Sequence, residues 1–397
     1  MKATKGLALL VALFVNAANA VVIPPPAVSA DHYIIIDNKT GSVIAESKAD
    51  ERRDIASLTK LMTAYVTFNE IKSGTLSLDE PVKVSKKAWK AKGSRMFIEV
   101  GDHVPVRELL NGMLIVSGND AALALAEHIA GSEKQFVKLM NAYAEKLGMS
   151  NTLYANASGY KNGGERYSTA RDLSILSRAI IEEFPDLYKI MSSKEFTFNN
   201  IPQKNRNALL FESPHYDGMK TGWTVKAGYC LSTSFKKDNR RVTTVVLGAN
   251  SSKQRFTTAK TLTNYGFRRF HNVTPVKADT PVHALPVFYG AQKEVFAYPA
   301  YDYTMTIPRS LPTHETQDER ISLNAFFESN GDYGTKLFAP IDDVIEVGRL
   351  EVHFEGQLVE TIPLIVRDKV EEGSWSSKFK DWVFLSTHSI FVEPFSD

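Results

Sequence analysis

Ser57-Leu58-Thr59-Lys60 begins a run in which apolar side chains recur every three or four positions, and this spacing predicts a helix over residues 58–71. Ser57 would then lie at the helix N-terminus, with Lys60 one turn further on and on the same face. A serine becomes a strong nucleophile only when a base removes its proton, and a neutral amine can be that base. The N–H groups at the helix N-terminus would also favour a developing oxyanion. We therefore expect Ser57 to be a nucleophile and Lys60 to be its base.

The Ser-x-x-Lys pattern alone is weak evidence, because it recurs at Ser158-x-x-Lys161 and at Ser377-x-x-Lys380. What distinguishes Ser57 is a fixed order of two further motifs. Ser117-Gly118-Asn119 begins 60 positions after Ser57, and Lys220-Thr221-Gly222 begins 163 positions after it.

Each of the two later motifs also has a second match elsewhere in the chain, at Ser322-Leu323-Asn324 and at Lys39-Thr40-Gly41. The second of these precedes Ser57 and is typical of a hairpin turn between strands that we expect at residues 33–36 and 43–45. Only one set of motifs runs in the order Ser-x-x-Lys, Ser-x-Asn, Lys-Thr-Gly, with the first opening a helix and the last opening a strand. This ordered set is typical of penicillin-binding proteins and class A β-lactamases.

Four longer stretches resemble the D-alanyl-D-alanine carboxypeptidases, the low-molecular-mass penicillin-binding proteins of the cell-wall system. The resemblance extends over about residues 28–370 and is carried by residues 93–106, 117–122, 167–172 and 217–229. It implies a penicillin-recognising transpeptidase fold and a serine-type hydrolase. Such an enzyme removes the terminal D-alanine from a peptidoglycan stem peptide ending in D-Ala-D-Ala, through an acyl-enzyme on Ser57. β-Lactam antibiotics should acylate the same serine, because their strained amide lies beside a carboxylate much as the dipeptide bond does.

The chemistry needs a lysine that is neutral near pH 7, although the ordinary pKa of lysine is about 10.4. Burial and a neighbouring positive charge both lower that pKa, and the resembled fold places Lys220 beside the cleft to supply the charge. Ser117 can relay a proton to the leaving amine, and Asn119 can hold a substrate amide or orient Lys60. A plainer interpretation is that Ser117-Gly118-Asn119 caps the following helix, and both interpretations can hold at once.

The resemblance also assigns substrate contacts around the third motif. An acyl transfer needs two N–H donors for its oxyanion, and these would come from the backbones of Ser57 and Trp223. A guanidinium is the best partner for the free carboxylate of the substrate, and Arg255 would provide it with the help of Thr221.

Gly222 and Arg206 match the family as well and would line the substrate cleft. Two positions depart from a close relative, which has histidine where this chain has Trp223 and Ser158. At Trp223 we expect altered specificity or pH behaviour with the backbone donor retained. At Ser158 we expect altered deacylation rather than loss of acylation.

The first 20 residues have the pattern of an export signal. Lys2 and Lys5 precede an apolar run over residues 6–15, and Ala18-Asn19-Ala20 is a small-residue cleavage site. The apolar run is too short to span a bilayer comfortably. We therefore expect cleavage after Ala20 and a periplasmic enzyme.

The length of 397 residues suggests two domains, because a domain averages about 150 residues. Residues 28–272 mix strands with helices and predict an α/β (α+β) catalytic domain, with an antiparallel sheet closed by its first and last segments. After a linker over residues 274–281, residues 280–370 predict a small all-β domain. The expected helices cover residues 58–71, 106–114, 120–129, 133–147, 169–182 and 254–267, and the expected strands cover residues 33–36, 43–45, 228–234, 242–249, 294–298, 303–307, 345–354 and 358–366.

Residues 373–397 form a distinct tail. Its residues Trp375, Phe379, Trp382 and Val383 share one side of a helical wheel, with lysines elsewhere. Aromatic residues beside lysines suit a helix lying at a membrane surface, so we expect attachment to the outer face of the cytoplasmic membrane. The family commonly carries such an anchor. The alternative is a tail that packs on the β domain or stays disordered.

Composition excludes several other functions. A net charge of +2 gives no reason to expect nucleic-acid binding. The nine histidines are scattered without metal-ligand spacing, so we expect no metal and no cofactor. Cys230 is the only cysteine, and its strand-like surroundings favour a buried core residue over a reactive thiol.

Two alternatives to a carboxypeptidase stay open. A class A β-lactamase shares the acylation residues, but it also needs Glu-x-x-x-Asn between the second and third motifs to activate the deacylating water. One match exists, from Glu195 to Asn199, and it lies 25 positions before Lys220 in an alternating, strand-like run. The second alternative is a non-catalytic wall-binding protein of the same fold. An intact nucleophile and base argue against it.

Overall fold

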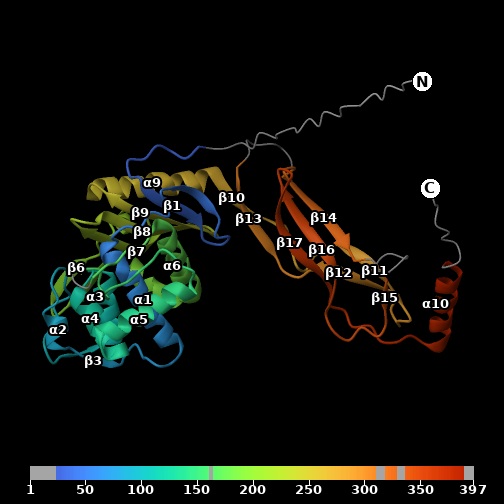
Figure 1. The fold of residues 1–397 in the computed structure, drawn as a ribbon, viewed down its shortest axis with the longest axis horizontal. Coiled ribbons are helices and arrows are strands. Elements are labelled where there is room, and N and C mark those ends of the chain that lie inside the picture. The colour runs from blue at the N-terminus through green and yellow to red at the C-terminus, as the bar shows by residue number, and fades with distance from the viewer. Residues whose placement is uncertain (1–23, 161–163, 310–317, 329–335, 389–397) are drawn as a thin grey trace, which may run out of the picture. The chain divides into compact units, whose positions relative to one another are not determined.

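A computed structural model describes residues 24–160, 164–309, 318–328 and 336–388. The expected export signal, Lys161 and the end of the expected tail lie outside these residues. The chain divides into two compact units (Figure 1). The N-terminal unit comprises residues 24–273 and 305–309, and the C-terminal unit comprises residues 274–304 and the described residues after 309.

The N-terminal unit is built on a five-stranded antiparallel sheet in the order β2-β1-β9-β8-β7. The strand that opens the unit thus pairs with the strand that nearly closes it, as the sequence predicts. The hairpin turn expected at Lys39-Thr40-Gly41 joins the first two strands. The strands are β1 (His32–Asp37), β2 (Val43–Ser47), β7 (Tyr216–Thr224), β8 (Gly228–Lys237) and β9 (Arg240–Ala249), with two small hairpins of β3 (Pro81–Lys83) with β4 (His103–Pro105) and β5 (Glu195–Phe198) with β6 (Ile201–Lys204).

Helices cover both faces of this sheet, with α9 on one face and α6 on the other (Figure 1). The helix α1 (Thr59–Lys72) contacts α3, α4, α5 and α6, and its first ten residues are all buried. A helix that is buried all round belongs to the core, so the core itself positions the nucleophile region. The other helices are α2 (Lys86–Trp89), α3 (Val106–Leu114), α4 (Asn119–Ala130), α5 (Glu133–Lys146), α6 (Ala170–Glu183), α7 (Pro185–Tyr188), α8 (Leu209–Glu212) and α9 (Ser252–Arg269).

The C-terminal unit contains a six-stranded sheet in the order β14-β16-β17-β12-β11-β15 and a separate helix, α10 (Trp375–His388). The alternation of buried and exposed residues along β12 and β16 produces its small core. Its sheet strands are β11 (His283–Phe288), β12 (Glu294–Pro299), β14 (Ile321–Phe327), β15 (Leu337–Phe338), β16 (Ile345–Phe354) and β17 (Gln357–Val366). The expected fold class, a mixed helix-and-strand unit followed by a mainly β unit, is therefore confirmed.

The linker expected over residues 274–281 is wrong at its start. The strand β10 (Phe270–Val276) includes its first three residues and pairs with β13 (Tyr303–Pro308) in a two-stranded sheet. Pro275 is compatible with such a strand, because an edge strand needs ladder hydrogen bonds on one side only. Among the described residues, no helix combines the length and the apolar character that crossing a bilayer requires.

Candidate active site

Ser57 lies in a 3₁₀ turn, Ala56–Leu58, which leads directly into α1. Ala56 has a φ of 47°, a left-handed conformation that costs a non-glycine residue about 1 kcal/mol or more. Asp54 fixes this turn, since its Oδ1 accepts from the backbone N–H of Ala56 at 3.0 Å and its Oδ2 accepts from Arg166 at 2.9 Å. The strained turn is thus held by a buried ion pair, and it presents Ser57 at the start of a buried helix.

Lys60 is completely buried beneath Ser57. Its Nζ donates to three oxygen atoms, Oγ of Ser57 at 3.2 Å, Oδ1 of Asn119 at 2.6 Å and the carbonyl of Ser158 at 2.7 Å. Burial lowers the pKa of Lys60 to about 7, although the carboxylate of Asp120 acts in the opposite direction. An amine with this pKa is neutral often enough near pH 7 to accept the proton of a neighbouring hydroxyl.

Asn119 begins α4, and both ends of its side-chain amide are engaged. Its Oδ1 accepts from Lys60, and its Nδ2 donates to the carbonyl of Lys92 at 2.6 Å. Of the two roles expected for Asn119, this arrangement serves the orientation of Lys60. The capping interpretation of the second motif is wrong. The N-cap residue Gly118 has no side chain, and among the described residues neither Ser117 nor Asn119 bonds through its side chain to a first-turn N–H of α4.

Ser117 stands in the loop before α4 with a φ of 65°, which is again a left-handed conformation of a non-glycine residue. Its hydroxyl lines the active-site cavity and has no hydrogen-bond partner among the described residues. It is therefore free to bond to a substrate group.

Lys220 lies on β7 with 2% of its surface exposed, and its Nζ donates to one acceptor, the carbonyl of Thr221 at 3.1 Å. Burial and the positive charge of Lys60 lower the pKa of Lys220 well below its ordinary value. Among the described residues Lys60 has three acceptors and Lys220 has one, so Lys60 is the member of the pair that binds a proton more readily, as the base of the reaction must. The structure differs here from the expectation that a charged Lys220 lowers the pKa of Lys60, since burial is the main cause and Arg206 supplies the added charge.

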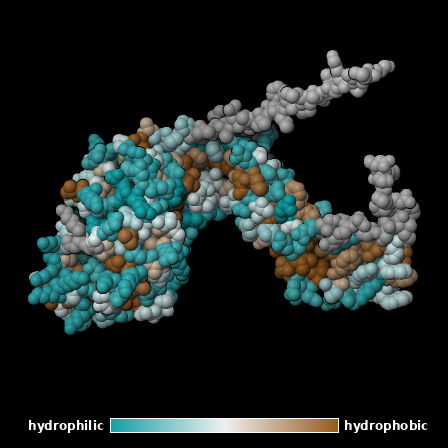
Figure 2. Space-filling view, viewed as in Figure 1, coloured by the Kyte–Doolittle hydropathy of each residue, from teal (hydrophilic) through white to brown (hydrophobic). Residues whose placement is uncertain are grey.

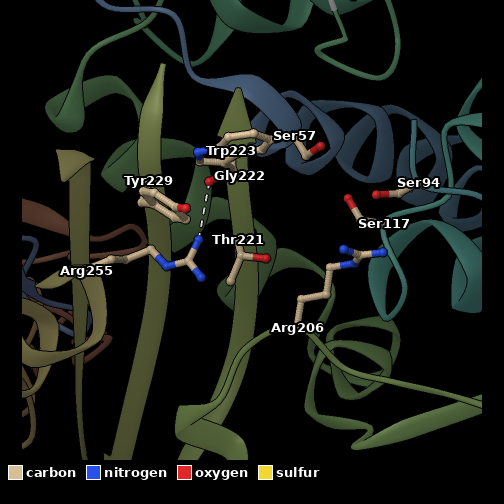
Figure 3. A pocket seen from close by; sticks show the side chains of 9 residues that line it. All are labelled: Ser57, Ser94, Ser117, Arg206, Thr221, Gly222, Trp223, Tyr229 and Arg255. Carbon is tan, nitrogen blue, oxygen red and sulfur yellow. Dashed lines mark hydrogen bonds between the residues drawn. The ribbon is translucent and has the colours of Figure 1, made fainter. Parts of the chain in front are cut away.

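A cavity of about 320 Å³ opens beside Ser57 (Figure 3). Seven of the ten residues predicted for the site line this cavity, and the other three, Lys60, Asn119 and Lys220, are buried. The lining residues are Ser57, Ser94, Ser117, Arg206, Thr221, Gly222, Trp223, Tyr229 and Arg255.

Gly222 brings the edge of β7 against the nucleophile turn. A Cβ atom at this position would lie 2.8 Å from the carbonyl oxygen of Ile55 and 3.2 Å from the backbone nitrogen of Ser57. Only glycine permits so close an approach. The backbone next to Trp223 therefore lies beside the backbone N–H of Ser57, as a pair of oxyanion donors requires.

Arg255 reaches the cavity from α9 and is only 6% exposed. Its Nη1 donates to the carbonyls of Gly222 and Cys230, both at 3.3 Å (Figure 3). Its Nε is buried without a partner among the described residues. Burial lowers the pKa of Arg255 to about 10, so the guanidinium stays charged at neutral pH. A buried cation with long hydrogen bonds is suited to binding a carboxylate.

Arg206 lies on the opposite side of the cavity from Arg255, with its guanidinium beside Ser117 (Figure 3). Its Nε donates to the carbonyl of Val116 at 3.0 Å. Arg206 therefore supports the loop that carries Ser117, in agreement with its expected place in the cleft.

Sequence reasoning missed several residues of the site. Tyr229 pairs directly with Trp223 across the β7–β8 hairpin, and their ring centroids are 5.8 Å apart. The register of this hairpin was the signal from which Tyr229 could have been predicted to lie at the site. Ser94 lies in a loop beside the site, and its backbone carbonyl accepts a hydrogen bond from the backbone N–H of Asn119 at 2.7 Å. Ser158 was singled out in the sequence for its side chain, whereas its contribution here is a backbone carbonyl, a role that no residue type signals.

The Glu-x-x-x-Asn match of the β-lactamase alternative does not reach the cavity. Glu195 is exposed on β5, and Asn199 donates to the carbonyl of Phe97 at 3.2 Å. Cys230 is buried, and burial raises the pKa of its thiol to about 11, which confirms the expected core role. Within the described ranges, no three histidine, cysteine or acidic residues are grouped as metal ligands.

Comparisons with known proteins agree with this geometry. A family model described as D-alanyl-D-alanine carboxypeptidase, peptidase S11, matches residues 18–251, and a model described as penicillin-binding protein 5, C-terminal domain, matches residues 270–372. The chain is 40% identical to the D-alanyl-D-alanine carboxypeptidase DacC of Escherichia coli K12, over 94% of this chain and 92% of that protein.

Two solved structures are similar as well. Penicillin-binding protein 5 of Haemophilus influenzae superposes with a TM-score of 0.76 at 34% identity, covering 88% of this chain and 100% of that one. Penicillin-binding protein D2 of Listeria monocytogenes, solved in an ampicillin-bound form, has a TM-score of 0.57 at 33% identity. It covers 62% of this chain and 99% of that one.

Proposed function

This chain belongs to the D-alanyl-D-alanine carboxypeptidases, a family of serine peptidases, and we propose that it removes the terminal D-alanine from peptidoglycan stem peptides through an acyl-enzyme on Ser57. The observation that carries the proposal is the distance of 3.2 Å between Nζ of Lys60 and Oγ of Ser57, beside a cavity that also contains Arg255. A nucleophile, a base and a cation for the substrate carboxylate thus surround one space.

In the acylation step, Oγ of Ser57 attacks the carbonyl carbon of the penultimate D-alanine, and Lys60 accepts the hydroxyl proton. The carbonyl oxygen becomes an oxyanion, which the backbone N–H groups of Ser57 and Trp223 stabilise. The C–N bond then breaks. The leaving amine receives the proton of Lys60 through the hydroxyl of Ser117, D-alanine departs, and an ester remains on Ser57.

In the deacylation step, water attacks the ester carbon and gives its proton to Lys60. The second oxyanion collapses, the C–O bond to Ser57 breaks, and Oγ recovers a proton from Lys60. The shortened peptide leaves as a carboxylic acid, which gives its remaining proton to solvent and becomes a carboxylate. Because Ser158 has no side chain that could serve as a second base, Lys60 serves both steps in this scheme.

Arg255 and Thr221 hold the terminal carboxylate of the substrate during both recognition and acylation. This contact distinguishes a carboxypeptidase substrate from an internal peptide bond, which has no carboxylate at that position. A β-lactam presents a carboxylate next to its strained amide, so it acylates Ser57 in the same orientation. The ampicillin-bound form of the Listeria relative supports this part of the proposal.

We also propose that the protein is exported and that α10 attaches it to the outer face of the cytoplasmic membrane. Asp381 fixes one side of α10 to the C-terminal unit, by accepting from the backbone of Tyr289 at 2.6 Å and from Lys293 at 2.7 Å. The side chains of Trp375 and Trp382 are exposed by 81% and 56%, and Figure 2 shows hydrophobic surface on this unit. Exposed tryptophans on a short helix favour the interface of a bilayer.

Labelled penicillin tests the acyl-enzyme, combined with measurement of D-alanine released from a D-Ala-D-Ala peptide. The wild type should release D-alanine and carry the label on Ser57 by mass spectrometry, with slow turnover of the antibiotic. Ser57→Ala should lose both, whereas Ser377→Ala, in the imitation motif on α10, should keep both. Rapid penicillin turnover without D-alanine release would indicate a β-lactamase, and a label that persists in Ser57→Ala contradicts the proposal. Flotation with anionic liposomes, with and without Trp375→Ser/Trp382→Ser, tests the membrane contact.

A further inference from the structure

A second cavity, of about 610 Å³, lies in the N-terminal unit next to the active site. Its walls include four lysines from one short segment, Lys86, Lys87, Lys90 and Lys92. They also include Asn119 and Ser158. The positive side chains therefore surround a hollow rather than spread over a convex face.

This cavity shares its inner wall with the catalytic lysine. Asn119 and Ser158 provide two of the three oxygen atoms to which Lys60 donates. One loop separates the two cavities, since Lys92 lines the second and Ser94 lines the first. Gly93 lies between them with a φ of 91°, and a Cβ there would lie 2.7 Å from Nδ2 of Asn119. The loop is therefore pressed against the site, and the lysines lie immediately beyond it.

Most of the positive charge in this cavity is not neutralised. Lys87 pairs with Glu133 at 3.1 Å and lies 3.9 Å from Glu127. Lys86, Lys90 and Lys92 have no acidic partner within 4.0 Å among the described residues. A lysine run is most often a solvated face. This hollow, however, is lined by four lysines against one acidic residue, Glu133, and a hollow with such an excess of positive charge attracts anions more strongly than a flat surface does.

The direction of a bound peptide connects the two cavities. Arg255 and Thr221 lie on one side of Ser57, and Ser94 lies on the other (Figure 3). A peptide with its terminal carboxylate at Arg255 and its scissile carbonyl at Ser57 therefore continues towards Ser94 and the lysine loop. On the basis of the proposed function, we propose that the lysine-lined cavity binds a carboxylate carried by the stem peptide upstream of D-Ala-D-Ala. The enzyme would then select peptides that carry a carboxylate upstream of D-Ala-D-Ala over peptides that share only this C-terminus.

Two synthetic peptides ending in D-Ala-D-Ala test this inference. They are identical except that the residue upstream of the dipeptide carries a carboxylate in one and a carboxamide in the other. The wild type should have the higher kcat/KM for the carboxylate peptide, with the difference in KM. Lys90→Gln/Lys92→Gln should lower the ratio of the two kcat/KM values about fivefold, since exposed charge pairs contribute modestly. Raising the salt concentration should lower the same ratio in the wild type.

Lys236→Gln/Lys237→Gln is the matched control, because it removes the same charge from exposed positions at the far end of β8. This control should keep the wild-type ratio. The inference is overturned if the wild type does not prefer the carboxylate peptide, or if both double variants change the ratio equally. If only this inference fails, the wild type still hydrolyses both peptides, including the carboxamide peptide. If the proposed function fails, the wild type hydrolyses neither peptide.

Discussion

The Nζ atom of Lys60 lies closer to Oδ1 of Asn119, at 2.6 Å, than to Oγ of Ser57, at 3.2 Å. The amide of Asn119 is neutral, so it orients Lys60 without adding a charge that would fix the proton on Nζ. A carboxylate at the same position would have a different effect, because an opposite charge in contact favours the ammonium form. The chemistry of this pair therefore depends on the amide being uncharged.

Asn119→Asp should raise the pKa of Lys60 above about 7 and reduce the neutral base at neutral pH. The rate of penicillin acylation at pH 7 should fall about tenfold or more and recover partly as the pH rises. The pH profile of the acylation rate constant measures this shift. Asn119→Ala is the control, and it should lower the rate without moving the profile to higher pH. A profile of Asn119→Asp that coincides with that of the wild type contradicts the role given to Lys60.

Lys60→Met should change the pH dependence of stability. The pKa of Lys60 is about 7 in the folded protein, whereas an unfolded lysine has a pKa of about 10.4. Between these values the unfolded chain binds more protons, so the wild type gains stability as the pH rises from about 7 to about 10. Relative to Lys60→Met, this gain should be on the order of 4 kcal/mol at most. Thermal unfolding of both proteins across this pH range measures it, and a constant difference in Tm contradicts the lowered pKa.

Much of the fold was predictable because the signals are local. The helix expected at residues 106–114 and the strand expected at residues 345–354 have the same bounds in α3 and β16. The strands β11, β14 and β15 were missed for physical reasons. Pro286 interrupts β11, and β14 lies at a sheet edge with nearly all its residues exposed or half-buried, so it lacks the alternation of a strand with one buried face. Two residues, the length of β15, are too few to form a pattern.

The site was predictable where residue type carries the chemistry. Ser57 and Lys60 stand one helical turn apart, and the spacing alone places them together. The carbonyl of Ser158 was not predictable, because any residue has one. The left-handed turn at Ala56 was also hidden, since it depends on the contact of Asp54 with Arg166, which lies 112 positions away. Contacts of this length follow from tertiary structure and leave no local trace in the sequence.

Arg255→Leu should remove the preference for a free C-terminal carboxylate. A charge-assisted hydrogen bond contributes about 1.5–3 kcal/mol, which corresponds to about a tenfold to hundredfold loss in kcat/KM. The substrates to compare are a D-Ala-D-Ala peptide and the same peptide with a C-terminal carboxamide. Arg268→Leu, which removes an exposed arginine from the same helix, should behave as the wild type. Equal losses for both substrates would show that Arg255 only supports the carbonyls of Gly222 and Cys230.

Gly159→Ala should displace the nucleophile turn. Gly159 has a φ of 74°, and a Cβ there would lie 1.8 Å from the carbonyl oxygen of Ala56, so the loop and the turn cannot both stay in place. Gly131 is the matched control, because its φ is 71° and nothing lies within 4 Å of its Cβ position. Both alanines bear the left-handed strain of about 1 kcal/mol, and Gly159→Ala bears the overlap in addition. We expect Gly131→Ala to lower the Tm by about 2–4 °C, and Gly159→Ala to lower it about twice as much or more.

Penicillin acylation should fall at least about tenfold in Gly159→Ala alone, because a shift of about 1 Å at a reacting group is costly. Equal Tm values and equal acylation rates for the two variants would show that this loop does not hold Ser57 in position.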